Sequence, residues 1–130
     1  MDQEFSEEEI GKIAVDCAVR LHMAVGPGLF ESVYEVLLVG QLQERGLSVE
    51  RQVGIPINFE DQYFKEGFRA DIVIERKVIL ELKSVESLHH AHKKQLITYL
   101  KLSGMKLGFL LNFGAPLMKD GISRIIHGNL

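Results

Sequence analysis

The chain has 130 residues, of which 46% are hydrophobic and 25% are charged, and its formal net charge is −3. This length suits a single domain spanning residues 1–130, and the composition is that of a globular protein, so we expect neither a disordered nor a fibrous chain. No apolar run approaches a membrane span, and the N-terminus is acidic where a secretion signal would be basic, which predicts a cytoplasmic protein without a membrane partner. The negative charge argues against tight, sequence-independent binding of a polyanion.

A first helix is predicted after Ser6, because Ser6 to Glu9 has the form of a capping box and Gly26-Pro27-Gly28 ends the helical pattern. The single cysteine, Cys17, lies on the apolar side of this helix, so we expect a buried thiol and neither a disulfide nor a cysteine-based zinc site. His22, beside the apolar side of this helix, is expected to be a partly buried structural residue. The apolar stripe consists of Ile10, Ile13, Ala14, Cys17, Leu21, Ala24 and Val25.

A second helix is predicted from Leu29 to about Arg45. Glu31 and Tyr34 are three residues apart near its start and therefore share a side of the helix. Glu31 has two interpretations: a favourable partner for the helix dipole, or a third carboxylate that reaches a site formed elsewhere in the chain. The apolar positions of this helix include Leu29, Val33, Val36, Leu37 and Leu42.

From Leu47 to Phe68 the apolar residues alternate as they do in strands, with a turn expected at Glu60-Asp61. Pro56 indicates an edge strand or the end of a strand, because proline cannot donate to a sheet ladder. We expect this segment to form one antiparallel meander with the hairpin that follows it.

That hairpin runs from Arg69 to Lys83, where two β-branched runs flank Glu75-Arg76-Lys77. A turn centred on Arg76 places Asp71 opposite Glu81 and Arg69 opposite Lys83. Asp71, Glu81 and Lys83 then share one face of the sheet, since side chains alternate along a strand.

Two carboxylates opposed in this way suggest a metal site. Opposed residues lie about 4.5–5.5 Å apart at Cβ, so Asp71 and Glu81 can hold one ion, and without it their repulsion raises one pKa. Mg²⁺ is commonly held by one or two carboxylates, with waters and phosphates completing its shell. Lys83, beside this ion, could orient or help deprotonate the attacking water, or neutralise charge that develops on a phosphate oxygen. The spacing indicates metal-assisted phosphodiester hydrolysis; the alternatives are an ordinary surface ion pair or a shifted register.

A third helix is predicted from about Leu88 to Ser103. Gln95 and Tyr99 project together from it and can orient water or phosphate, although such pairs are often plain surface residues. The next segment, Lys106 to Phe113, is apolar on both sides, which predicts a buried strand parallel to the second hairpin strand through a right-handed crossover. A loop over residues 114–121 and a short last strand over residues 122–127 complete the chain.

The polar side of the third helix offers the best candidate for a basic surface that faces nucleic acid. His92, Lys93 and Lys94 are the residues we assign to this contact. Zinc is disfavoured, because the spacing of the histidines lets at most two imidazoles converge and no cysteine is near. This side of the helix carries His89, His90, His92, Lys93, Lys94, Gln95 and Lys101.

Together these motifs resemble the PD-(D/E)XK nuclease superfamily and, within it, the small bacterial proteins called the GxxExxY family. The resemblance rests on Asp71, on Glu81-Leu82-Lys83 and on Gln95 followed four residues later by Tyr99. It also rests on the stretch Gly28-Leu-Phe-Glu-Ser-Val-Tyr34, which matches the GxxExxY motif at every fixed position. One departure is Ala70, which stands where the superfamily's name has proline.

The resemblance implies an α/β (α+β) fold of the restriction-endonuclease type, with a central mixed β-sheet flanked by helices. It implies that Asp71 and Glu81 bind Mg²⁺ or Mn²⁺, and that the Leu82 carbonyl can add a ligand. Lys83 would position or activate water. Glu31 would add a ligand directly or through water. Gln95 and Tyr99 would complete the site.

Three functions are therefore weighed. The first is a Mg²⁺-dependent nuclease that acts on DNA. The second is a non-catalytic nucleic-acid-binding or protein-assembly module, favoured by the acidic net charge, which could form a homodimer through an apolar patch on the first helix or bind another protein. The third, hydrolysis of a small phosphate ester or nucleotide, ranks last because the sequence has no glycine-rich phosphate cradle.

Overall fold

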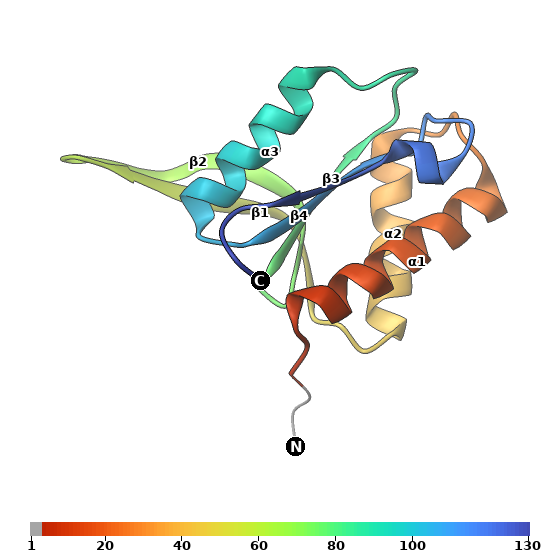
Figure 1. Cartoon of the computed structure of the whole chain (residues 1–130), viewed down its shortest axis with the longest axis horizontal. Helices are drawn as coiled ribbons and strands as arrows, with labels where there is room; N and C mark the ends of the chain where they lie inside the picture. Colours follow the sequence, from red (N-terminus) through yellow and green to blue (C-terminus); the bar gives the residue numbers. More distant parts are fainter. Residues whose placement is uncertain (1–3) are drawn as a thin grey trace.

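The computed structural model describes residues 4–130; residues 1–3, where the acidic N-terminal segment begins, lie outside it. Over the described residues the chain forms an α+β fold, in which one mixed sheet lies between α1 and α2 on one face and α3 on the other (Figure 1). The elements are α1 (Glu7–Val25), α2 (Glu31–Glu44), β1 (Val49–Phe59), β2 (Gln62–Ile74), β3 (Val78–Lys83), α3 (His90–Ser103), β4 (Leu107–Asn112), a 3₁₀ turn (Met118–Gly121) and β5 (Ile122–Ile126).

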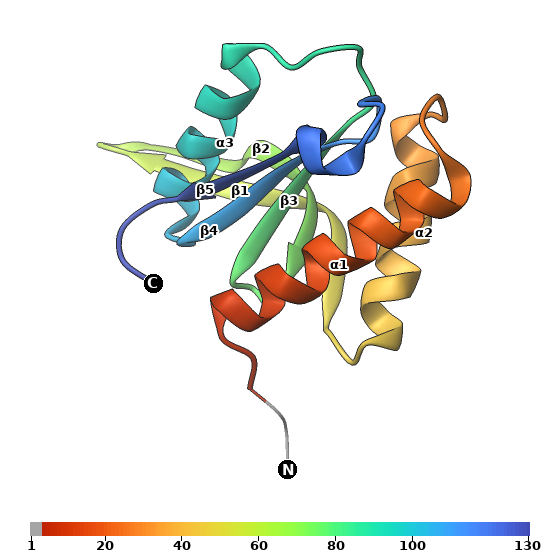
Figure 2. The ribbon, with the colours of Figure 1, turned by 45° about the vertical axis from the view of Figure 1, so that its right-hand side comes forward.

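The strand order is β1-β2-β3-β4-β5, as Figure 2 shows. The first three strands form the expected antiparallel meander, α3 carries the chain across the sheet, and β4 lies parallel to β3, as predicted. β5 pairs with β4 in the antiparallel sense. The parallel pair needs a crossover, and α3 provides it on the face opposite α1 and α2.

The hairpin between β2 and β3 has the predicted register, with Ile72 opposite Leu80. Its turn residues Glu75 and Arg76 have φ angles of 52° and 54°, the positive values that a type I′ turn requires. The β2–β3 pairs end at Ile72, so neither Asp71 with Glu81 nor Arg69 with Lys83 forms the expected strand pair. The two strands separate beyond that point, where Asp71 lies.

Two hydrophobic clusters hold the layers together. The larger one packs α1 and α2 onto the sheet, and the smaller one packs α3 onto the other face. The α1 capping box forms as predicted, with Ser6 Oγ accepting from Glu9 N at 3.2 Å. Cys17 is buried, and burial raises the pKa of its thiol. His22 is buried too, and its Nε2 lies 2.8 Å from the Ala115 carbonyl oxygen.

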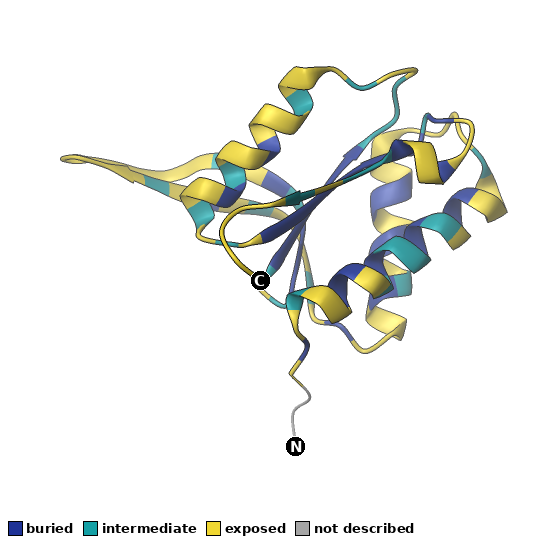
Figure 3. Ribbon diagram, in the orientation of Figure 1, coloured by how far each residue is buried: buried dark blue, intermediate teal, exposed yellow. Residues whose placement is uncertain are grey.

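The packed faces of α1 and α2 differ in part from the apolar positions in the sequence. Ala24 and Val25 are exposed because the last turn of α1 lies at the rim of the molecule, as Figure 3 shows for this end of the helix. In α2 the buried residues are Tyr34, Glu35, Leu38, Val39 and Leu42. Four of the apolar positions named from the sequence are instead exposed: Leu29, Val33, Val36 and Leu37.

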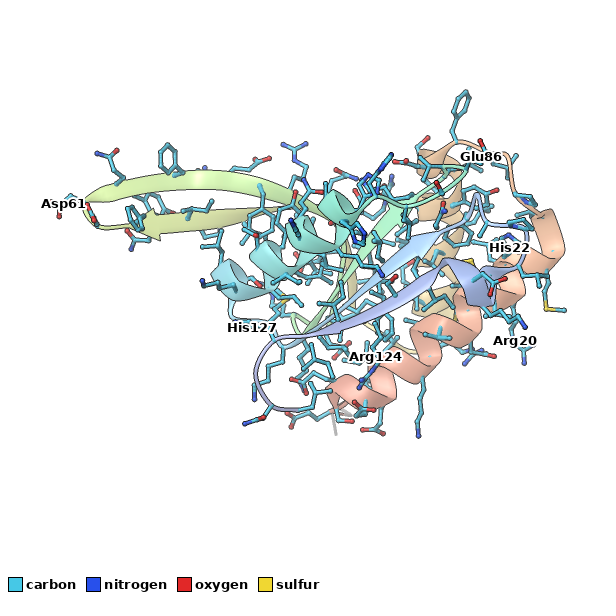
Figure 4. All side chains as sticks on the ribbon, turned by 45° about the horizontal axis from the view of Figure 1, so that its top comes forward. Arg20, His22, Asp61, Glu86, Arg124 and His127 are labelled. Atoms are coloured by element: carbon cyan, nitrogen blue, oxygen red, sulfur yellow. The ribbon has the colours of Figure 1, made fainter. Side chains whose placement is uncertain are left out.

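The outer parts of β1 and β2 form a two-stranded arm that projects from the body, with Asp61 at its tip (Figure 4). Its turn falls at Glu60-Asp61, as predicted. Pro56 lies in the edge strand β1 at a break in register between Ile55 and Ile57, in agreement with the edge position expected from proline. Three aromatic side chains of the arm are exposed: Phe59, Tyr63 and Phe64.

None of the helices in the described part of the chain combines the length and the apolar character that crossing a bilayer requires.

Candidate functional site

Asp71 and Glu81 meet where β2 and β3 separate. The Asp71 backbone N donates to Glu81 Oε1 at 3.0 Å, and the Leu82 backbone N donates to Asp71 Oδ2 at 2.9 Å. Each carboxylate thus replaces a backbone carbonyl as the acceptor of a sheet hydrogen bond. The two bonds fix both side chains at the point where β2 and β3 separate, which we call the fork.

An irregularity in β1 and β2 directs Asp71 into this fork. Val49 packs on the α1–α2 side of the sheet, whereas Val53, four residues later, packs on the α3 side. Regular alternation would put both on one face, so the strand rotates between them. Gln52, with a φ of 49°, lies at this rotation opposite Asp71 and donates to its Oδ1 through Nε2 at 3.4 Å.

Burial and the nearby charge of Asp71 disfavour ionisation of Glu81. Glu81 is only 6% exposed, and burial, followed by the charge of Asp71, raises the pKa of its carboxyl to about 8. The Asp71 N–H and the charge of Lys83 act in the opposite direction. The sequence predicts a raised pKa from repulsion, and here desolvation is the larger cause. A cation at this point would relieve both effects.

Lys83 and Tyr99 lie on the α3 side of the fork. Ile79 packs against α3, so Glu81 and Lys83, two and four residues later on the same strand, share its face. Tyr99 stacks on Phe68 with ring centroids 3.8 Å apart. Burial, then the charges of Glu81 and Asp71, raise the pKa of the Tyr99 phenol, and Gln95 acts against them. The structure therefore gathers Gln95 and Tyr99 with the two carboxylates.

Glu31, the first residue of α2, borders the fork from the other helical layer. Its Oε1 accepts from the Ser84 backbone N at 3.3 Å, immediately after Lys83. A cavity of about 180 Å³ lies between α2 and the fork. It is lined by Glu31, Ser32, Glu35, Gln52, Asp71 and Leu82.

Glu35 and Gln52 border the site and were not among the residues predicted from the sequence. Glu35 is 5% exposed and accepts from Arg51 Nη2 at 2.7 Å and from Gln52 Nε2 at 2.7 Å. The chain Glu35–Gln52–Asp71 thus ties α2 to the fork. The one sequence signal is the four-residue spacing of Glu31 and Glu35, which places both on neighbouring turns of a helix.

The proposed nucleic-acid contacts lie at the start of α3. Lys93 and Lys94 are exposed, whereas His92 is partly buried. Partial burial and then the charge of Lys83 lower the pKa of the His92 imidazole, and Glu31 opposes this. His92 therefore lies close enough to Lys83 and Glu31 to sense their charges, and the two lysines face solvent beside it.

The donor set suits a hard cation held by few protein ligands. In residues 4–130, no three or more His, Cys, Asp or Glu side chains converge in a way that could hold a metal ion, so Glu31 does not complete a three-carboxylate group. Two carboxylates with oxygen donors, one of them buried and hard to ionise, match the usual protein share of a Mg²⁺ shell.

A larger hollow, of about 440 Å³, lies between α1 and strands β4 and β5, away from the carboxylate pair. Three of the four charged residues that line it lie in ion pairs, Arg124 with Glu8 and Asp16 with Arg20. Arg124 and Arg20 both lie on the α1 side of the molecule in Figure 4. The fork instead holds a buried carboxyl group with a strongly raised pKa, Glu81, beside Asp71, so we place the candidate site there.

Comparison with known proteins bears on this arrangement. Neither a curated protein nor a solved structure matches the chain. The model of the PD-(D/E)XK nuclease superfamily matches residues 8–125, which span all three helices and all five strands of the described chain except the first residue of α1 and the last of β5. With its mixed sheet, its flanking helices and its forked strand pair, the chain belongs to the PD-(D/E)XK nuclease superfamily.

Proposed function

We propose that the protein is a Mg²⁺- or Mn²⁺-dependent nuclease of the bacterial GxxExxY family that hydrolyses phosphodiester bonds in DNA, acting as a single cytoplasmic domain. The observation that carries this proposal is the pair Asp71 and Glu81 at the fork of β2 and β3, with the Glu81 pKa raised to about 8. Membership of a nuclease superfamily supports the nucleic-acid substrate.

In this proposal the two carboxylates, together with the Leu82 carbonyl, hold the cation. A bound Mg²⁺ supplies polarisation of the scissile phosphate and stabilises the leaving oxygen. Lys83, on the same face as Glu81, orients the attacking water and balances charge that develops on the phosphate. Glu31 contributes through a water, because its carboxylate borders the cavity at Asp71 without joining a three-ligand group.

Gln95 and Tyr99 position the substrate from α3. The Tyr99 phenol is held against Phe68 and lies within the electrostatic reach of both carboxylates. A tyrosine phenol is protonated near neutral pH, and the raised pKa preserves this state, so the hydroxyl can donate a hydrogen bond to a phosphate oxygen. Lys93 and Lys94 contact the strand beyond the site.

The test is cleavage of single-stranded and duplex DNA and RNA with Mg²⁺, Mn²⁺ or EDTA. We expect metal-dependent cleavage of DNA that Asp71→Asn abolishes and that Lys83→Ala lowers by at least about 100-fold, the usual share of an acid–base or charge-stabilising group. Lys83→Ala should still bind Mg²⁺ in calorimetry. Lys12→Ala, an exposed lysine on α1, is the matched control and should cleave at the wild-type rate. Cleavage by Lys83→Ala at that same rate would remove Lys83 from the mechanism.

The alternative is a non-catalytic module that binds nucleic acid or assembles with protein. Its specific support is the net charge of −3 and the exposed apolar side chains of α2, which include Val36 and Leu37. It predicts no cleavage under any metal condition, and a species heavier than the monomer in sedimentation.

A further inference from the structure

Phe30 is a large apolar side chain that is 82% exposed, and it immediately precedes Glu31. A single exposed apolar residue needs no explanation by itself, because much of any protein surface is apolar. Two features set this one apart: the rigidity of the backbone that carries it and the hollow that it borders.

The backbone around Phe30 is held from two sides. The buried Tyr34 hydroxyl donates to the Gly26 carbonyl at 2.6 Å and accepts from the Leu29 N–H at 3.1 Å. Its ring stacks on Phe113 with centroids 4.3 Å apart. From the sheet side, Ser84 Oγ donates to the Leu29 carbonyl at 2.8 Å. The phenyl group of Phe30 is thus presented to solvent from a fixed segment.

The hollow beside Phe30 shares lining residues with the cavity at Asp71. It measures about 380 Å³ and is lined by Leu29, Phe30, Glu31, Ser32 and Ser84. Glu31 and Ser32 also line the cavity that contains Asp71. The two spaces therefore share a border at the start of α2, where Phe30 lines one of them and Asp71 lines the other.

We propose that Phe30 stacks on an unpaired base of a nucleic-acid strand whose neighbouring phosphate lies at Asp71 and Glu81. This rests on the proposed nuclease function and adds a substrate class: single-stranded or splayed DNA in place of continuous duplex. The reason is geometric, because in a duplex each base face is covered by its neighbour, whereas an unpaired base offers its face to an aromatic ring.

A second copy of the chain is the competing occupant, since Val33 and Leu37 continue an exposed apolar surface along α2. A copy seated over Phe30 would cover this hollow. A nucleic-acid strand would use both this hollow and the cavity at Asp71, which have Glu31 and Ser32 in common, and on this ground we assign the hollow to the strand.

The experiment uses tryptophan fluorescence, because the chain contains no tryptophan. Phe30→Trp introduces a single reporter at the proposed stacking position, and Phe59→Trp, at the exposed arm, is the matched control. Both are made in the Asp71→Asn background and, in parallel, with Asp71 retained in EDTA. The probes are a single-stranded DNA oligomer, the same sequence as duplex, and an abasic oligomer of equal length and charge.

We expect the single-stranded oligomer to quench the tryptophan at position 30 and not the one at position 59, and the abasic oligomer to quench neither. Phe30→Ala should bind the single strand about ten- to a hundredfold more weakly than the parent, with little change for duplex. Quenching by the abasic oligomer, equal quenching by duplex, or no quenching while anisotropy reports binding would overturn the stacking role. So would a blue shift at position 30 that grows with protein concentration alone, which would assign the surface to a second copy.

Cleavage by the wild-type protein distinguishes failure of the stacking role of Phe30 from failure of the nuclease function. Metal-dependent cleavage without base-specific quenching refutes the role of Phe30 and leaves the nuclease standing. Absence of both cleavage and binding refutes the two together.

Discussion

At the scale of single residues, the fork between β2 and β3 holds a carboxyl group, Glu81, that resists ionisation. Glu81 is buried beside Asp71, and its pKa of about 8 compares with an ordinary value of 4.5. A raised carboxyl pKa means that the folded protein binds the proton more tightly than the unfolded chain does. The stability gained from this proton is complete below about pH 4.5 and is lost as the pH rises through 8.

This linkage predicts the behaviour of Glu81→Gln in metal-free protein. At pH 5 both proteins carry a neutral group at position 81 and should unfold at similar denaturant concentrations. At pH 9 the wild type must bury a charge, so the variant should be more stable by about 2–4 kcal/mol, somewhat less than the full linkage of the shift. Urea unfolding at both pH values, in EDTA, measures this.

The exposed Glu60→Gln on the arm is the control and should show no such pH-dependent difference. An equal stability difference between Glu81→Gln and wild type at pH 5 and at pH 9 would contradict the assigned ionisation. Saturating Mg²⁺ should reverse the order at pH 9, since only the wild type offers both carboxylates to the ion.

At the scale of elements, α2 is the helix whose packing was hardest to foresee. Apolar residues surround most of its circumference, so two opposite stripes both look like a packed face. The structure buries the stripe that contains Tyr34 and Leu38, and the charged Glu35 goes with it because Arg51 and Gln52 satisfy its carboxylate.

Neighbouring leucines of α2 test which face is packed. Leu38 is fully buried and Leu37 is 41% exposed. Leu38→Ala should lower the free energy of unfolding by about 2–5 kcal/mol through a cavity in the core. Leu37→Ala should change it by about 0.5 kcal/mol or less, because its removal exposes little new surface. Chemical denaturation of the two variants measures both values, and similar losses would show that α2 uses its other face as well, for example in an oligomer.

At the scale of the whole molecule, a net charge of −3 must be reconciled with a nucleic-acid substrate. Binding then depends on a local surface, and the exposed Lys93 and Lys94 on α3 are the candidates beside the fork. Each phosphate contact releases counterions and steepens the dependence of affinity on salt.

Lys93→Ala combined with Lys94→Ala should therefore reduce the slope of log affinity against log salt by roughly 1–2. Titration of labelled DNA at several salt concentrations measures the slope. The matched control combines Lys12→Ala with Lys106→Ala, which removes the same charge from exposed positions elsewhere. The same change of slope in both double variants would mean that overall charge, and not α3, sets the attraction.

Much of this architecture was predictable because it depends on local chemistry. Short-range rules predict three features that the structure contains: the Ser6 capping box, the turn at Glu75-Arg76 and the strand β4, which is buried on both faces. The register of the β2–β3 hairpin followed as well, because its turn and its β-branched runs fix which residues oppose each other. That register brings Glu81 near Asp71, and the irregularity at Gln52 then directs Asp71 into the fork.

The features that could not be predicted depend on contacts between segments that are far apart in the sequence. The rotation at Gln52, the approach of Glu35 and the hydrogen bond from Ser84 to the Leu29 carbonyl beside Phe30 each involve residues of different elements, which no local pattern encodes. The order of the elements and the identity of the two carboxylates could be inferred from the sequence, because spacing and propensity act along the chain. Which face of α2 is buried and how the fork opens could not, because packing between layers selects among faces that are equally apolar.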